Sequence, residues 1–289
     1  MISNLFISNR WCKMNAEHYN NQFLKLLGEN DLATAQKLHS IFGLTIDNYA
    51  LNSAFITSYK NGHIETAKWL HQLGANIHAN NEYAFGWSCA NGHIEFSKWL
   101  YESGANIHVD DESAFHLSCS NGHIEIAKWL HQLGANIHAD DESAFKYSCR
   151  YGHIEVAKWL YQLGANIHTD DECAFRYSCR HGHIEIAKWL HQLGVNIHTD
   201  DECAFRYSCR YGHIEIAQWL HQLGANIHAN NDEAFKCGTK KIVLWLKELE
   251  SNKGSEIDIL KKEIQNLKNE NQILKNKLNQ IQSIVEASQ

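Results

Sequence analysis

The sequence predicts an all-α protein, a solenoid of about eight helix pairs followed by a C-terminal coiled-coil helix. Three observations predict this fold class. A unit of 30 residues recurs six times between residues 61 and 240, and within each unit apolar residues recur at helical spacing. After residue 256, apolar positions alternate by three and four. Because a repeated unit buries its apolar side only against its neighbours, such a chain folds as a stack.

Composition limits the class of protein further. The chain has 289 residues, a formal net charge of −7 and 44% hydrophobic residues. The mild negative charge implies no general attraction to nucleic acid or to anionic membranes. The apolar runs are too short to span a bilayer, and the N-terminus lacks the basic start and long apolar core of a signal peptide. We therefore expect an intracellular, cytoplasmic protein whose nine cysteines are free thiols.

The first helix of the unit follows a Gly-His pair and begins with the sequence IE; we name it the GHIE helix. In the copy at residues 151–180, Ile154, Ala157 and Leu160 lie on one side of this helix. Gly164 follows the last apolar residue and suits a left-handed C-cap. The six copies are in register at their turn glycines, which are Gly62, Gly92, Gly122, Gly152, Gly182 and Gly212.

The second helix of the unit contains an Ala-Phe pair; we name it the AF helix. The segment DDECAFRYSC at residues 170–179 predicts it, with Asp170 or Asp171 as the N-cap. Phe175 and Cys179 are expected on its buried side. Gly182 is expected to end this helix and to open the next GHIE helix.

These segments resemble the ankyrin repeat. The matching stretches are SAFHLSC (113–119), SAFKYSC (143–149), CAFRYSC (173–179 and 203–209) and YAFGWSC (83–89), together with the Gly-His turn and the GANI sequence. Alanine stands where the family has proline, and each unit is about three residues shorter than the family's 33. The missing residues fall where the family builds its β-hairpin finger, so short fingers are implied. The 30-residue unit also resembles the ankyrin proteins of giant DNA viruses of amoebae, which implies action inside an infected host cell.

The expected domain organisation has four parts. Residues 1–15 form a short N-terminal segment, and residues 16–250 form the solenoid, with degenerate caps at 16–46 and 231–250. A linker is expected at residues 251–256, where the sequence is polar and contains glycine. The coiled coil is expected at residues 257–287.

Cysteine and histidine residues crowd together at Cys173, Cys179, His181 and His183, which raises the alternative of a zinc site. The cysteines that occupy the same position in five units are Cys89, Cys119, Cys149, Cys179 and Cys209. Helices of adjacent layers pack about 8–10 Å apart, which is too far for two thiolates to share a metal. We therefore interpret the cysteines as core residues and the Gly-His histidines as turn residues. We expect no metal site, no cofactor and no catalytic residue.

Function in a solenoid is expected where its units differ, which here is the last two turns of the AF helices. In the family, these positions line the concave groove. The C-terminal copies place Arg with Tyr or His there, and such residues are enriched in binding hot spots. The candidate partner-binding residues are Arg150, Tyr151, Arg180, His181, Arg210, Tyr211, Lys146, Arg176, Arg206, Tyr147, Tyr177 and Tyr207. The alternatives are nucleic-acid binding by the same residues, or a solvated surface copied by duplication.

The tail predicts a parallel homodimer. Its apolar seam comprises Ile257, Leu260, Ile264, Leu267, Asn271, Leu274, Leu278, Ile281 and Val285. A single Asn at an a position, with Leu predominant at d, favours two parallel strands. A helix that folds back on the stack, or a trimer, remains open. The sequence as a whole predicts a non-enzymatic adaptor that binds an unidentified protein partner and dimerises through its tail.

Overall fold

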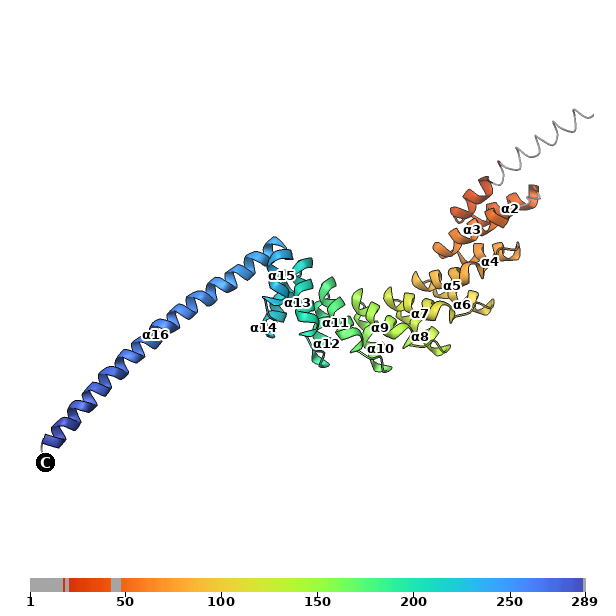
Figure 1. Cartoon of the computed structure of the whole chain (residues 1–289). Helices are drawn as coiled ribbons and strands as arrows, with labels where there is room; N and C mark the ends of the chain where they lie inside the picture. The colour runs from red at the N-terminus through yellow and green to blue at the C-terminus, as the bar shows by residue number, and fades with distance from the viewer. Residues whose placement is uncertain (1–17, 19–20, 43–47, 288–289) are drawn as a thin grey trace, which may run out of the picture. The chain divides into compact units, whose positions relative to one another are not determined.

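The structure is a computed structural model that describes residues 18, 21–42 and 48–287 (Figure 1). The predicted segment at residues 1–15 lies outside the described residues. In the described part of the chain every regular element is a helix, and these helices form eight successive pairs, as predicted. None of the described helices combines the length and the apolar character needed to cross a membrane.

The helices follow the repeat closely. Residues 21–28 are helical. The remaining helices are α2 (Leu32–Phe42), α3 (Asn48–Lys60), α4 (Ile64–Gln72), α5 (Ala79–Ala90), α6 (Ile94–Glu102), α7 (Val109–Ser120), α8 (Ile124–Gln132), α9 (Ala139–Arg150), α10 (Ile154–Gln162), α11 (Thr169–His181), α12 (Ile184–Gln192), α13 (Thr199–Tyr211), α14 (Ile214–Gln222), α15 (Ala229–Cys237) and α16 (Lys240–Ala287).

The chain forms two compact units, residues 1–199 and residues 200–289. In the first unit the AF helices α5, α7, α9 and α11 lie side by side in one layer (Figure 1). Each packs against the GHIE helix that follows it, so the GHIE helices form a second layer. The second unit contains α13 from Asp200 onward, together with α14, α15 and the long helix α16.

The core consists of the residues that the repeat copies. The Phe and Cys side chains of successive AF helices are fully buried, among them Phe115, Phe145, Cys119 and Cys149. Burial raises the pKa of the Cys89 thiol to about 12, so this thiol is neither a ready nucleophile nor a ready metal ligand. The five cysteines at the repeated position are all buried, which confirms their interpretation as core residues, whereas Cys237 is exposed.

The glycine turns have the predicted geometry. Gly182 ends α11 in the left-handed region, with φ 86° and ψ 14°. Gly164 follows α10 with φ 100°, and the amide of Ala165 donates to the carbonyl of Leu160 at 3.1 Å. That six-residue closure is the Schellman motif expected at a glycine C-cap.

The start of the AF helix differs from the prediction. Asp170, Asp171 and Glu172 all have positive φ, between 49° and 63°, so they form a left-handed turn and not a helix N-terminus. The turn is held by its neighbours, because His168 donates its amide to Asn166 Oδ1 at 3.0 Å and its ring Nδ1 lies 2.9 Å from Glu172 Oε1. The prediction of an Asp N-cap is therefore wrong: with three residues fewer than the family unit, the chain reverses here through this turn.

The prediction that residues 251–256 form a linker between two separate elements is also wrong. Helix α16 runs without interruption from Lys240 to Ala287 (Figure 1). A single Gly254 costs a helix only about 1 kcal/mol, and the segment contains no proline that would remove a backbone donor. The first turns of α16 are anchored by Ile242 and Leu246, which are fully buried.

Candidate partner-binding site

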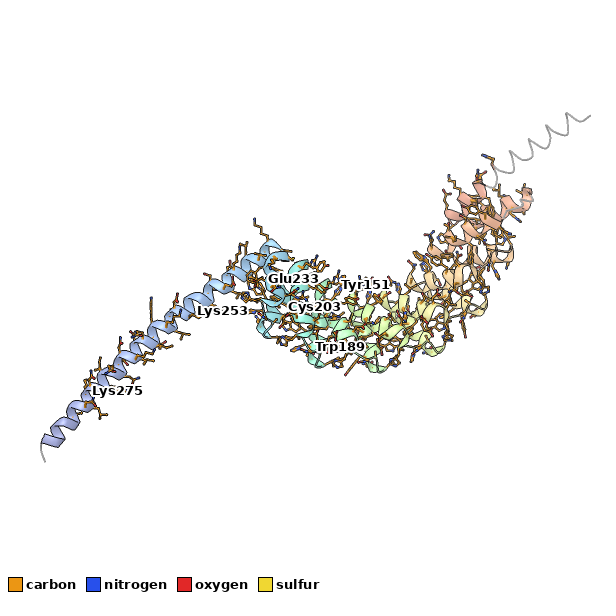
Figure 2. The ribbon with its side chains drawn as sticks, viewed as in Figure 1. Tyr151, Trp189, Cys203, Glu233, Lys253 and Lys275 are labelled. Carbon is orange, nitrogen blue, oxygen red and sulfur yellow. The ribbon has the colours of Figure 1, made fainter. Side chains whose placement is uncertain are left out.

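The predicted binding residues lie at the C-terminal ends of three AF helices. Those of α9 and α11 belong to the first unit, and those of α13 belong to the second unit. Tyr151 lies on the side of the AF helices, whereas Trp189 lies among the GHIE helices (Figure 2). In the first unit we call the surface formed by the ends of α7, α9 and α11 the AF face.

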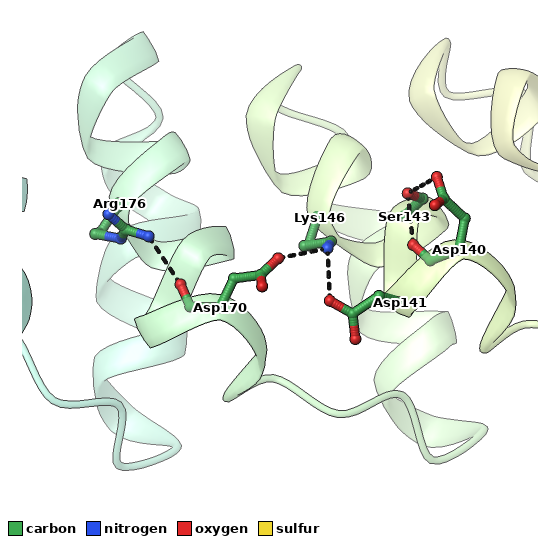
Figure 3. Close-up of polar contacts among 6 residues, drawn as sticks. All are labelled: Asp140, Asp141, Ser143, Lys146, Asp170 and Arg176. Atoms are coloured by element: carbon green, nitrogen blue, oxygen red, sulfur yellow. Dashed lines mark hydrogen bonds and ion pairs between the residues drawn. The ribbon is translucent and has the colours of Figure 1, made fainter.

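Lys146 occupies an internal position between two repeats. Its side chain is only 11% exposed, and its Nζ lies 3.1 Å from Asp141 Oδ2 and 2.7 Å from Asp170 Oδ2 (Figure 3). Burial lowers the pKa of Lys146, but the hydrogen bonds to Asp170 and Asp141 outweigh burial and raise it overall. The ammonium group therefore joins one left-handed turn to the next.

The arginines at the equivalent position also hold these turns. Arg176 Nη2 donates to the carbonyl of Asp170 at 2.8 Å (Figure 3). Arg206 donates to the carbonyls of Asp200 and Asp201 at 2.9 and 2.8 Å, and it forms an ion pair with Glu233 of the next repeat. In a left-handed turn few backbone N–H groups of the helix reach these carbonyls. The two arginines therefore supply hydrogen bonds that the carbonyls would otherwise lack. The arginine cations face the protein's own backbone and carboxylates.

Arg150 has different surroundings. Its guanidinium carbon lies 5.7 Å from the ring centroid of Tyr147, 5.5 Å from that of Tyr151 and 5.2 Å from that of Tyr177. The rings of Tyr147 and Tyr151 are stacked, with an interplanar angle of 19°. Its Nε is buried without a hydrogen-bond partner, and among the described residues no carboxylate forms an ion pair with it. Three aromatic rings therefore hold a cation that lacks an anion.

A hollow of about 410 Å³ lies beside Arg150, between α7 and α9. Its lining residues are Asp110, Ser113, His116, Leu117, Ser120, Tyr147, Arg150 and Tyr151. Leu117 and Tyr151 are 37% and 50% exposed, so apolar surface faces solvent here. Burial lowers the pKa of His116, although nearby carboxylates oppose the effect, so this imidazole is neutral at pH 7.

The remaining predicted residues lie near the ends of α11 and α13. Arg180 is half-buried and His181 is exposed at the end of α11, directly before Gly182. In the second unit Tyr207 and Tyr211 meet with ring centroids 6.3 Å apart, and Arg210 is exposed beside them. Burial raises the pKa of Glu233, but the hydrogen bonds from Arg206 and Asn230 and the charge of Arg210 lower it overall.

Sequence reasoning missed a second aromatic cluster, in the N-terminal repeats. Tyr83 stacks on Trp87 with centroids 5.9 Å apart, and Lys60 Nζ lies 5.5 Å from the Trp87 centroid. An adjacent hollow of about 190 Å³ is lined by Asn52, Phe55, Ile56, Tyr59, Asn76, Ile77, Ala79, Asn80, Tyr83 and Ala84. Its signal in the sequence was Tyr83, which stands where the next four units have Ser or Cys.

The predicted seam of α16 lies exposed along one helix. Ile257, Leu260, Ile264, Leu267, Leu274, Leu278 and Ile281 are each 50–61% exposed. Asn271 is exposed as well, and the side chain of Val285 lies outside those that the structure describes. The described part of this chain therefore leaves the apolar stripe uncovered.

Comparison with known proteins identifies the repeat. A family model described as ankyrin repeats in many copies matches residues 51–101, and one described as ankyrin repeats in three copies matches residues 108–171 and 163–231. Together these matches cover more than half of the chain. Among solved structures, the chain is similar to the crystal structure of the human ASB11 ankyrin repeat domain, with a TM-score of 0.50 and 18% sequence identity. That match covers 62% of this chain and 95% of the other chain, and at this identity it shows the fold alone. No curated protein matches the chain.

Proposed function

Because the chain belongs to the ankyrin-repeat family, we propose that it is a non-enzymatic adaptor that binds a protein partner on its AF face and dimerises through α16. Ankyrin repeats are generally protein–protein interaction modules. The observation that carries the proposal is the hollow at Arg150, where exposed Leu117 and Tyr151 adjoin a cation held by aromatic rings. Exposed aromatic and Arg residues around a concavity are typical of binding hot spots.

The proposal also covers where the protein acts. The resemblance of its 30-residue unit to the ankyrin proteins of giant DNA viruses supports action inside a cell. The described cysteines form no disulfide, which suits a reducing compartment, because disulfides form and persist in oxidising ones.

The proposed dimer is supported by the uncovered stripe of α16 and by the charges that flank it. In a parallel pair, Glu263 and Glu270 at g positions would face Lys268 and Lys275 at e positions of the second copy. Each such pair is worth only a few tenths of a kcal/mol, so it selects orientation more than it stabilises. Asn271 at an a position favours two strands in register.

The dimer is tested by the solution mass of the full chain, measured by light scattering. The full chain should have the mass of a dimer, and a chain that stops at Glu250 should be a monomer. Leu260→Lys, in the seam, should also give a monomer. Its matched control is Ile259→Lys, which alters a neighbouring exposed residue outside the seam and should leave the dimer intact. A monomeric full chain, or equal effects of the two lysine variants, would contradict the proposal.

Partner binding is tested by selecting displayed random dodecapeptides on the immobilised full chain. Binding of the selected peptides should weaken in Tyr151→Ser. The control is Tyr161→Ser, which removes a comparably exposed tyrosine (41%) from a GHIE helix and should leave the affinity unchanged. Failure to select any peptide, or loss of binding in the Tyr161 variant alone, would refute the assignment of the AF face. Displacement of the peptides by a single-stranded oligonucleotide would favour nucleic-acid binding instead.

A further inference from the structure

The basic residues of the AF face fall into two groups according to what they already bind. Lys146 is neutralised by Asp141 and Asp170 and is nearly buried. Arg150, one turn further along the same helix, has three tyrosine rings around it and, among the described residues, no ion-paired carboxylate. Because buried guanidinium N–H groups nearly always find acceptors, the unpartnered Nε of Arg150 marks an incomplete set of contacts.

We propose that Arg150 binds a carboxylate of an acidic residue in an extended segment of the partner protein, while an adjacent apolar side chain of that segment packs against Leu117 and Tyr151. This inference rests on the proposed function and specifies the chemistry of the partner. Guanidinium groups match carboxylates in geometry and can donate two parallel hydrogen bonds to them. The tyrosine rings restrict the guanidinium before binding, which reduces the entropy lost when the ion pair forms.

Among the residues that line the hollow, Arg150 provides the positive charge for such a segment. His116 is neutral at pH 7, and Leu117 contributes apolar surface, so Arg150 is the cation that an acidic segment meets in this hollow. Asp110 lies at the exposed rim, and its Oδ1 already accepts a hydrogen bond of 2.6 Å from Asn81. A carboxylate placed at Arg150 therefore forms an ion pair with a cation that has no other anion beside it. The surface there is partly apolar, and ion pairs on such a surface are stronger than in water.

The substitution Arg150→Gln tests the role of this residue without threatening the stack. The backbone carbonyl of Arg150 accepts a hydrogen bond from His183 Nε2 at 2.9 Å, and that bond survives a change of side chain. Within the part of the chain that the structure describes, the side chain makes no ion pair that the fold would lose. Lys128→Gln is the matched control, because it removes the same charge from a GHIE helix outside the AF face, where Lys128 forms an exposed ion pair with Glu125.

The experiment uses the selected dodecapeptides, synthesised with Glu and with Gln at their acidic position, and measures affinity for the full chain and both variants. Arg150→Gln should weaken binding of the Glu peptide about tenfold or more. The Gln peptide should bind the unaltered chain about tenfold or more weakly than the Glu peptide does. Arg150→Gln should not weaken binding of the Gln peptide any further. Lys128→Gln should change binding of the Glu peptide less than about twofold.

Four results would overturn the inference. The first three are selected peptides that lack an acidic residue, equal binding of the Glu and Gln peptides, and equal effects of Arg150→Gln and Lys128→Gln. Tighter binding of a phosphoserine version through Arg150 would replace the carboxylate by a phosphate and would also overturn it. Each of these results leaves the proposed function intact if Tyr151→Ser still weakens binding. Failure to select any peptide would refute the proposed function itself.

Discussion

At four Gly-His turns, those of Gly62, Gly92, Gly122 and Gly152, the glycine lies against a histidine of the next repeat. Gly122 has φ 79°, and a Cβ at this position would lie 2.5 Å from His153 Nδ1. The same arrangement occurs at Gly92 and His123, whose Nε2 lies 3.0 Å from the carbonyl oxygen of Ala90. The glycine is therefore required twice, by its backbone conformation and by the ring that occupies the space beside it.

Substitution of two glycines separates these requirements. Gly134 also has positive φ (101°), but a Cβ there would meet nothing within 4 Å. We expect Gly134→Ala to lower the free energy of unfolding by about 1–2 kcal/mol, the cost of a left-handed alanine. Gly122→Ala adds a clash with His153 and should cost about 2–4 kcal/mol. Urea unfolding of both variants measures the difference. Equal losses in the free energy of unfolding would show that the His153 ring moves aside at no energetic cost.

The turn histidines make stability depend on pH. Burial lowers the pKa of His63 and of His153, and the charge of neighbouring histidines lowers it further. Because the unfolded chain then binds more protons than the folded chain, the free energy of unfolding is highest above the ordinary histidine pKa of 6.5. It should fall as the pH drops from 6.5 towards the lowered values of the folded state.

The pH prediction is checked by urea unfolding at pH 7.5 and at pH 5.5. These values lie above the range in which Asp170 and Glu233 titrate, because the pKa of both is lowered from already acidic values. His153→Gln removes one titrating ring, so the loss of stability between the two pH values should be smaller than in the unaltered chain. An identical loss in the variant would contradict the role given to His153.

At the level of single residues, copying along the chain made the core predictable. Phe175, Cys179 and Gly182 recur in register. The burial of the first two, and the left-handed helix end at the third, explain why each copy keeps these residues. The state of each cation was not predictable in the same way. Lys146 and Arg150 are both basic residues of one AF helix, and only the structure shows that the first is ion-paired and the second lies among tyrosine rings.

At the scale of elements, the left-handed turns join neighbouring AF helices. Three consecutive residues with positive φ are strained, at roughly 1–2 kcal/mol each for residues other than glycine. Asp140, Asp141 and Glu142 adopt this conformation in the first turn of α9, as Asp170 and its neighbours do in the first turn of α11. Lys146 spans both turns, so its ion pairs offset part of the strain that the shortened repeat imposes.

Removal of this cation tests the link between the turns. Lys146→Met keeps the length and apolar stem of the side chain but leaves Asp141 and Asp170 without their shared ammonium. We expect a loss of about 1 kcal/mol in the free energy of unfolding, since both carboxylates remain solvated. Lys128→Met is the control, because Lys128 forms only an exposed pair with Glu125 and should change stability by less than about 0.5 kcal/mol. Equal losses of stability in the two variants would mean that the ion pairs of Lys146 contribute nothing to the free energy of unfolding.

The elements themselves could be predicted because their apolar periodicity is strong and repeated six times. Their junctions could not. The acidic run before each AF helix is compatible with an N-cap or with a left-handed turn, and contacts such as that of His168 with Glu172 decide between them. Likewise, the polar segment at residues 251–256 resembles a linker, but the buried anchors at Ile242 and Leu246 start a helix that continues through it.

At the scale of the whole molecule, the two proposed interactions reinforce one another. A dimer carries two AF faces, so a partner that presents two copies of its segment engages the second face as an intramolecular event. The gain depends on the effective concentration of the second site and can reach about 10²–10⁴ without any new contact. Helix α16 runs without interruption from its buried first turns into the proposed seam.

Dissociation from a surface coated with the selected peptide measures this gain. At high peptide density the full chain should dissociate at least about 100-fold more slowly than the chain that stops at Glu250, because both faces must release together. At a density too low for both faces to bind, the two rates should converge. Leu260→Lys should behave like the shortened chain and Ile259→Lys like the full one. If the full chain dissociates at the same rate at both densities, the two faces cannot engage one surface together, and dimerisation then serves to bring two separate partners together.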